Sequence, residues 1–336
     1  VLVFNQIVIN GRRFVFLTWL WVLCSYSHAV GPVQDLSKAE ALVIQGEWSL
    51  ARRYLEPAIY SPHITNQLRS RFYYVRAYSF FEERLYVSAK KDFHRALEFD
   101  SSNWDAVYSL GRIYYYGKGA DQDFELGVSF FRQAAEFNHR DAKFYIGYAT
   151  VHGRGIEKNE AEGLAILAAL SKEEHVLSML HLANYYRGKT ESGDQVSSSR
   201  VVDLYLRALS MGSADAALAL GFMYKNGELV AMNAQLSYDY FVQAVALGNR
   251  QALLHLAYAH MIGSGAEQSY RLAKGYYLEA AEHNLEGGVL GLGHLYEFGL
   301  GLPVNKAAAE SFYQLASNGQ DSKVKVFREP ITTNHL

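Results

Sequence analysis

The feature that most constrains this chain is a segment that recurs about every 36 residues. Six segments align on a small residue that directly follows Leu or Ile, and the successive spacings are 36, 36, 38, 36 and 36 residues. These positions, called anchors below, are Gly111, Gly147, Ala183, Gly221, Ala257 and Gly293. Such a period is the signature of a repeat architecture, in which each unit buries its apolar face only against its neighbours.

Each repeat has the pattern of two helices joined by a glycine-containing turn. The residue five positions before the anchor is always small, so small and bulky side chains alternate along one stripe at helical spacing. In five of the six repeats Gly stands six positions after the anchor, where it is expected to end the first helix. No proline occurs between His63 and Leu302, which suits helices and short turns. The sequence therefore predicts an all-α fold, an α-solenoid of helix-turn-helix repeats.

The pattern resembles that of a known family. Leu-Gly-x-x-Tyr-x-x-Gly-x-Gly, followed by Ala-Ala, is similar to the Sel-one-like repeat (SLR), a relative of the tetratricopeptide repeat (TPR). The segment "LGRIYYYGKGADQDFELGVSFFRQAAEF", from Leu110, matches it best. The resemblance covers residues 103–320 and implies six SLR-type repeats wound into a right-handed superhelix. The third repeat departs from the pattern, because Ala183 replaces Gly and the second turn glycine is missing.

The chain divides into four segments on this interpretation. Residues 1–29 are expected to be a signal peptide, residues 30–102 TPR-like helical repeats, residues 103–320 the six repeats, and residues 321–336 a polar tail. In the first segment Arg12 and Arg13 precede an apolar run that ends at Cys24, and small residues at Ser27 and Ala29 predict cleavage after Ala29. The run is shorter than the ~20 residues that span a bilayer, so a retained membrane anchor is the weaker alternative. The expected location is periplasmic or otherwise extracytoplasmic, with no stable membrane span after cleavage.

Composition argues against several classes of function. The formal net charge is −2, so no basic excess points to nucleic acid. Cys24 is the only cysteine and belongs to the leader, so the mature chain offers no thiolate metal site. The segment "GKGADQ" lacks the third glycine of a dinucleotide loop and follows a helix pattern, so it is interpreted as a turn between helices. The sequence therefore predicts no catalytic residue, no metal and no cofactor.

The candidate binding residues come from the first helix of each repeat. In TPR-type solenoids these helices line the concave face, and by resemblance the positions one and four after the anchor are expected to point into it. Their chemistry varies among the repeats of this chain, as suits recognition of a partner protein or peptide. The predicted partner-binding residues are Arg112, Tyr115, Tyr148, Asn184, Arg187, Phe222, Lys225, Tyr258 and His294. The alternative is that several of these side chains pack against the neighbouring repeat.

The expected function is a non-catalytic scaffold or adaptor in the bacterial cell envelope, whose partners are other envelope proteins or peptides. One alternative is a polysaccharide-export or glycan-binding protein, which would expose Tyr115, Tyr148 and Tyr258 in one continuous line. A cell-wall enzyme is a second alternative, but the paired cysteines of relatives linked with β-lactam binding are absent. A eukaryotic secretory adaptor is a third, and the lack of N-x-[ST] sites in the mature chain favours bacteria.

Overall fold

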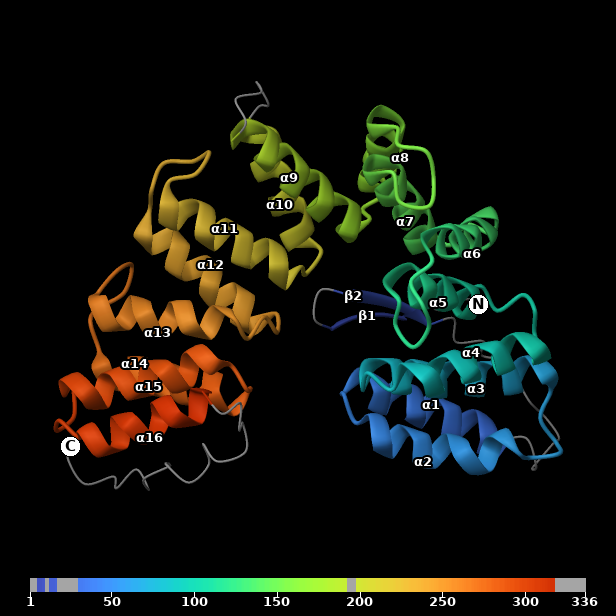
Figure 1. Ribbon diagram of the computed structural model, residues 1–336, viewed down its shortest axis with the longest axis horizontal. Helices are drawn as coiled ribbons and strands as arrows, with labels where there is room; N and C mark the ends of the chain where they lie inside the picture. Colours follow the sequence, from blue (N-terminus) through green and yellow to red (C-terminus); the bar gives the residue numbers. More distant parts are fainter. Residues whose placement is uncertain (1–4, 10–11, 17–29, 192–197, 318–336) are drawn as a thin grey trace. The chain divides into compact units, whose positions relative to one another are not determined.

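The structure is a computed structural model that describes residues 5–9, 12–16, 30–191 and 198–317. In this part of the chain it contains sixteen helices and two short strands (Figure 1). The strands are β1 (Asn5–Ile9) and β2 (Arg12–Phe16), which pair with each other. The helices are α1 (Val30–Ile44), α2 (Trp48–Ile59), α3 (Asn66–Glu82), α4 (Tyr86–Phe99), α5 (Trp104–Tyr116), α6 (Phe124–Glu136), α7 (Arg140–His152), α8 (Glu160–Lys172), α9 (Val176–Glu191), α10 (Ser198–Ser210), α11 (Ala214–Asn226), α12 (Ala234–Ala246), α13 (Ala252–Ile262), α14 (Tyr270–Glu282), α15 (Glu286–Phe298) and α16 (Lys306–Ser317).

The helical prediction is confirmed, and the strand pair is an addition to it. The two strands lie within the expected leader, and no pattern in the sequence analysis predicted them. The remainder of that leader, with the predicted cleavage position after Ala29, lies outside the described residues, as does the tail from residue 321. Among the described helices, none has both the length and the apolar character that crossing a membrane requires.

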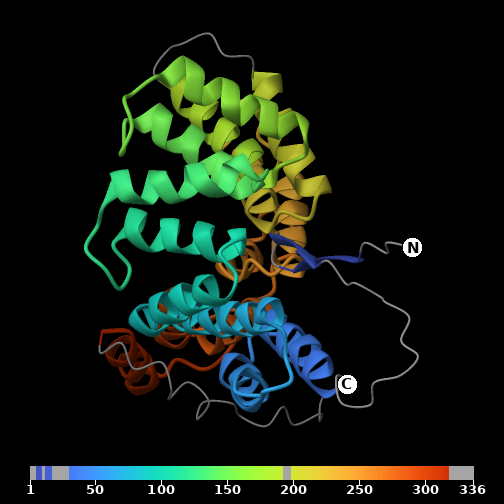
Figure 2. The ribbon, with the colours of Figure 1, turned by 90° about the vertical axis from the view of Figure 1, so that its right-hand side faces the viewer.

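The helices pack in the order of the chain, which is the α-solenoid arrangement that the repeats predicted. Two compact units divide the helices: those up to Leu182 belong to unit 1 and those from Ala183 to unit 2, so that the division falls inside α9. In unit 1 the pairs α3–α4, α5–α6 and α7–α8 pack internally, and α4–α5 and α6–α7 join one pair to the next (Figure 2). Unit 2 repeats this scheme from α11 to α16.

A large side chain on the second helix covers most anchors. All six anchors are buried. A Cβ added to Gly111 would lie 2.6 Å from the Phe131 ring, and one added to Gly221 would lie 2.5 Å from the Phe241 ring. Gly293 approaches a ring on α16 in the same way. These three glycines supply the space that an aromatic ring twenty residues later fills, whereas Gly147 meets Leu167, and the two helices of a repeat are held at close distance.

The turn glycines serve two different purposes. Gly117 ends α5 in the left-handed conformation, with φ of 65°, as expected for a glycine that stops a helix. Gly155, in the turn after α7, has φ of +70°, and an added Cβ would lie within van der Waals overlap of the Phe124 carbonyl oxygen at the start of α6. This second glycine therefore does more than keep the turn open, because it lets the turn pack against the preceding repeat.

The ends of helices also join one repeat to the next through hydrogen bonds. His175 precedes α9, where its Nδ1 accepts a bond from the Ser178 backbone N–H at 3.3 Å. Its Nε2 lies 2.8 Å from Oδ1 of Asp141, which belongs to the first turn of α7 in the preceding repeat. The equivalent contacts are His139 with Asp105 and Asn249 with Asp215. One side chain thus stabilises a helix start and a repeat junction together.

The packing of Gly155 yields a stability prediction. Replacing Gly155 with Ala is expected to lower the free energy of unfolding by about 2–4 kcal/mol, because the new Cβ would require a left-handed backbone and would overlap the Phe124 carbonyl. The matched control is Gly275→Ala on α14, where an added Cβ meets nothing within 4 Å. This control is expected to raise the stability by about 0.5–1 kcal/mol. Urea denaturation measures both, and an unchanged midpoint for Gly155→Ala would contradict the contact.

The junction at Asp141 yields a prediction for pH. Burial acts to raise the pKa of Asp141, but the hydrogen bond and charge of His175 outweigh it and lower the pKa. A carboxyl group with a lowered pKa stabilises the fold above its unfolded pKa of about 4, and this contribution is lost as pH falls through the folded pKa.

The Asp141 side chain is 44% exposed, so solvent screens the pair and Asp141→Ala should cost only about 0.5–1 kcal/mol at pH 7. The difference from the wild type should shrink by about pH 3 in urea titrations. Asp121→Ala, in the turn after α5, is the control with little expected effect. A wild-type advantage that stays constant over this pH range would refute the assignment.

Candidate protein-binding surface

The first helices expose the same face in every repeat. The residue five positions after the anchor is exposed in all six. These residues are Tyr116, His152, Gly188, Asn226, Ile262 and Phe298. They lie four residues after the position that directly follows the anchor, which is about one helical turn, so both positions share one face. The exposed face of the first helices is therefore centred on position five after the anchor, and position one beside it is exposed in three of the six repeats.

Tyr115, at position four, does not belong to this face, and its prediction as a partner-binding residue is wrong. Its side chain is fully buried, with its ring 5.0 Å from that of Phe124 and 5.7 Å from that of Phe131. Val151, at the same position of the next repeat, is buried too. Position four is turned about 60° away from position one, and in these two repeats it is covered by the packing of the helices, whereas Lys225 at position four of the fourth repeat is exposed. The buried Tyr115 also removes the continuous tyrosine line that a glycan-binding surface would expose.

Three of the predicted residues are partly buried and contact other aromatic side chains. Arg112 lies against the rings of Phe81 and Tyr108. The Tyr148 ring lies 4.9 Å from that of His181. The Phe222 ring lies 4.6 Å from that of His255. The second and third contacts join consecutive first helices, so these two rings pack against a neighbouring repeat as the alternative interpretation held.

The histidines in these contacts behave as aromatic side chains. Burial, with a smaller contribution from the nearby His152, lowers the pKa of His181 to about 4. Burial likewise lowers the pKa of His255 to about 4, with a smaller contribution from Lys225. Both rings are therefore neutral at pH 7 and can pack against Tyr148 and Phe222 without burying a charge.

Unit 2 brings the remaining predicted residues together. Lys225, Tyr258 and His294 are exposed, as is Asn184, whose Oδ1 accepts a 2.6 Å bond from the Tyr205 hydroxyl. Arg187 is partly buried, and its Nε lies 3.3 Å from the Glu228 carboxylate. The four exposed residues lie on α9, α11, α13 and α15, the first helices of consecutive repeats (Figure 1).

The first helices α11, α13 and α15 form a continuous surface in unit 2. The Lys225 ammonium group lies 5.3 Å from the centre of the Tyr258 ring, which connects α11 to α13. The backbone of Gly287 on α15 approaches Leu254 on α13, with an added Cβ only 2.8 Å from its side chain. The exposed residues of this surface, called the unit 2 stripe below, are Asn184, Lys225, Tyr258, Ile262, His294 and Phe298.

The stripe contains large apolar side chains that sequence reasoning missed. Ile262 is 48% exposed and Phe298 is 58% exposed, beside Tyr258 at 42%. The signal for Ile262 and Phe298 was present in the sequence, because each follows a predicted residue by four positions. Aromatic and aliphatic side chains exposed at this spacing, with a cation beside them, are typical of a protein-binding surface.

A serine, a histidine and an aspartate in unit 1 resemble a hydrolytic triad in their distances. The Ser178 hydroxyl lies 2.8 Å from His175 Nδ1, and His175 Nε2 lies 2.8 Å from Asp141. The sequence contains no motif that marks these three residues as a catalytic set. Ser178 is fully buried and His175 nearly so, which keeps the hydroxyl from any substrate. The three groups form the start of α9 and its junction with α7.

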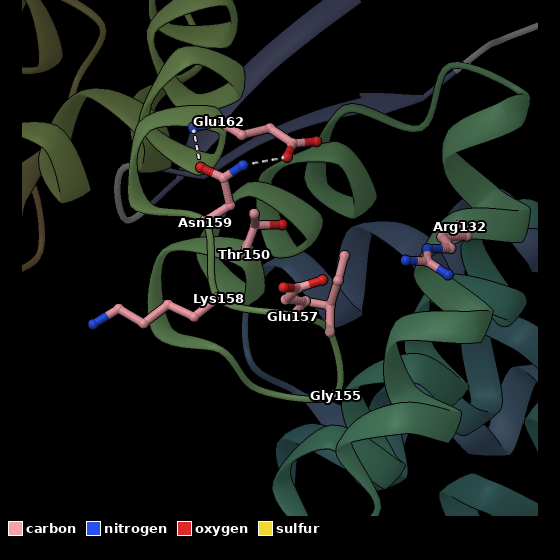
Figure 3. Close-up of a pocket in the computed structure, with 8 residues that line it drawn as sticks. Arg132, Thr150, Gly155, Glu157, Lys158, Asn159 and Glu162 are labelled. Atoms are coloured by element: carbon pink, nitrogen blue, oxygen red, sulfur yellow. Dashed lines mark hydrogen bonds between the residues drawn. The ribbon is translucent and has the colours of Figure 1, made fainter.

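A polar pocket of about 610 Å³ lies between α6 and the turn that joins α7 to α8 (Figure 3). Its polar groups are largely engaged in helix ends. Asn159 accepts a bond from the Glu162 backbone N–H and donates one to the Glu162 carboxylate, and the Thr150 hydroxyl donates to the Ile146 carbonyl. Figure 3 shows Lys158 extending away from Arg132, so the two cations do not converge on one ligand position.

The described residues also offer no arrangement of three or more His, Cys, Asp or Glu side chains that could hold a metal ion. The expectation that no metal is bound stays a prediction. In the described part of the chain, the predicted residues that are exposed lie on the first helices of unit 2.

Comparison with solved structures finds the same fold. A Sel1 repeat protein from Oxalobacter formigenes superposes with a TM-score of 0.54 at 22% identity, over 73% of this chain and 96% of that chain. A protective antigen of uropathogenic Escherichia coli that displays an SLR fold superposes with a TM-score of 0.52 at 22% identity, over 88% of this chain and 66% of that chain. At this identity both show a common fold alone.

The Sel1 repeat model matches the sequence in five places, which together make up just over half of the chain. The matches are residues 104–139, 140–169, 214–249, 250–285 and 289–321. The third repeat, anchored at Ala183, is not among them, although α9 and α10 form a helix pair there. Because these matches cover more than half of the chain, this protein belongs to the Sel1 repeat family.

Proposed function

We propose that this protein is a non-catalytic scaffold for protein–protein interaction and that the unit 2 stripe is its binding surface. The observation that carries the proposal is the exposure of Tyr258, Ile262 and Phe298 on neighbouring first helices. Proteins of the Sel1 repeat family generally serve as interaction scaffolds, which supports the same role here. The surface is preformed by packed helices, so binding a partner costs this protein little conformational entropy.

The chemistry of the stripe favours a partner with apolar side chains and some negative charge. Aromatic residues supply large contact areas and are enriched among the residues that dominate binding energy. Lys225 lies over the exposed Tyr258 ring, and it is available at the edge of the apolar area to steer an acidic group. An amphipathic helix or an extended segment of a partner protein has these properties.

The location proposed for this scaffold is the bacterial cell envelope, with other envelope proteins as partners. The basis is the sequence of residues 1–29, in which Arg12 and Arg13, the apolar run to Cys24 and the small residue Ala29 follow the order of a cleavable signal. Binding of polysaccharide is less well supported, because Tyr115 is buried and the proposed row of stacking tyrosines is interrupted.

The proposed leader can be tested by expression in a bacterial host. The mature protein is expected in the periplasmic fraction with Val30 as its first residue, as measured by intact mass and N-terminal sequencing. The substitution Ala29→Phe should block cleavage of the leader, because the cleavage site requires a small residue. Recovery of uncleaved wild-type chain in the cytoplasmic fraction would contradict the export proposal and leave the binding proposal untouched.

The binding surface can be tested with a photo-crosslinking amino acid placed at Ile262 in the native cells. Partner proteins are expected to crosslink at position 262, and the double variant Tyr258→Ser, Phe298→Ser should reduce their yield by about tenfold or more. The matched control is the double variant Val242→Ser, Leu272→Ser, which removes side chains of similar exposure, 40% and 43%, from the second helices. Equal yields from both double variants, with unchanged thermal stability, would refute the stripe as the binding surface.

A further inference from the structure

Unit 1 holds a guanidinium group whose hydrogen bonds the fold does not satisfy. Arg112 follows the anchor Gly111 on α5, and its Nε is buried without a hydrogen-bond partner. Its Cζ atom lies 4.6 Å from the centre of the Phe81 ring and 5.8 Å from the centre of the Tyr108 ring. Ring faces attract the cation, but they accept far weaker hydrogen bonds than a carboxylate does.

The neighbouring carboxylates do not take up this role. Glu82 and Asp141 are acidic residues in the neighbourhood of Arg112. Neither relieves the buried Nε, which has no hydrogen-bond partner. Asp141 is instead bound to His175 at 2.8 Å. A buried donor without an acceptor is unfavourable, so a ligand that supplies the acceptor gains that free energy on binding.

Aromatic side chains line the neighbourhood of the same guanidinium. The Phe81 and Tyr108 rings lie against it, and the Tyr145 ring lies 5.8 Å from that of Tyr108. On the exposed side of α5, the Tyr116 hydroxyl donates to that of Tyr145 at 3.3 Å. These side chains come from α3, α5 and α7, the first helices of three consecutive pairs in unit 1 (Figure 1). An anion that reaches Arg112 would therefore meet the planar fork of the arginine with aromatic walls beside it.

We propose that Arg112 anchors a carboxylate-binding subsite on the first-helix face of unit 1, and that its occupant is an acidic side chain of a partner protein. The inference deepens the proposed scaffold function and rests on it, because it assigns the chemistry of one contact. A carboxylate fits the guanidinium fork in a bidentate manner. The rings of Phe81 and Tyr108 cover part of the guanidinium, and a partly desolvated charge pair attracts more strongly than an exposed one.

The test uses the purified full-length protein and three short peptides. The first is acetyl-Ala-Leu-Glu-Leu-Ala-amide, the second has Gln in place of Glu, and the third is acetyl-Ala-Leu-Leu-Ala with a free terminal carboxylate. Binding is followed by NMR through the Nε–H signal of Arg112. The Glu peptide is expected to shift this signal and to bind about tenfold tighter than the Gln peptide. Equal affinities of the Glu and Gln peptides overturn the proposal. Tighter binding of the third peptide than of the first overturns the assignment of an acidic side chain, as opposed to a chain-terminal carboxylate, as the occupant.

Substitutions locate the effect. Arg112→Met should abolish the preference for Glu over Gln, and Arg112→Lys should retain a reduced preference, because it keeps the charge and loses the fork. Arg132→Met, which removes an exposed cation from α6, is the control expected to match the wild type. Should Arg112→Met fail to fold, the proposal is still tested by Arg112→Lys and by the affinities of the Glu and Gln peptides for the wild type. A preference that survives in Arg112→Lys at wild-type strength overturns the role of the guanidinium fork.

The crosslinking at Ile262 separates this inference from the proposed function. If the Glu and Gln peptides bind equally while partners still crosslink at position 262, the subsite is refuted and the scaffold stands. If the stripe variants and their controls also give equal crosslinking yields, the scaffold itself is refuted. The two experiments probe different units of the chain, so neither result can stand in for the other.

Discussion

The close approach of a glycine in the first helix to an aromatic ring in the second is the contact on which the other packing depends. Where Gly111 meets Phe131 and Gly221 meets Phe241, the ring occupies the volume that any other side chain at the anchor would need. The small residue cannot change without moving the ring, and the ring cannot change without opening a cavity. This pairing fixes the distance between the two helices of a repeat. As a consequence, the opposite face of the first helix stays exposed to solvent.

Most of the helical order could be predicted from the period, because the elements that define it are local. Gly117 ends α5 by its left-handed backbone, and the small anchor residues mark the side of each first helix that is buried. The third repeat is the exception, since its first helix, α9, continues to Glu191 and α10 begins at Ser198. The third repeat lacks the turn glycine, so nothing in its sequence marks where the first helix stops.

The candidate site was predicted in part, and its errors have a geometric cause. The helices and the column that follows the anchor were identified, with Tyr258 and His294 exposed as expected. Position four lies at the border of the exposed face, three residues after position one and so short of a full turn, and there the neighbouring rings bury Tyr115 while Lys225 stays exposed. Position five completes the turn and brings in Ile262 and Phe298. Contacts between distant residues, such as that of Ser178, His175 and Asp141, follow from the stacking of repeats and leave no motif in the sequence.

The neutral histidines between the repeats have a consequence for a protein that works outside the cytoplasm, as proposed here. Such a protein shares the acidity of its surroundings, whereas a cytoplasmic protein is buffered. The rings of His181 and His255, with pKa values of about 4, stay uncharged in moderately acidic media, so their contacts with Tyr148 and Phe222 persist. The unfolded chain does take up protons between about pH 6.5 and 4, so acidity lowers the free energy of unfolding while the shape of the surface is unchanged. In this fold, acid can therefore lower the free energy of unfolding without changing the shape of the folded surface.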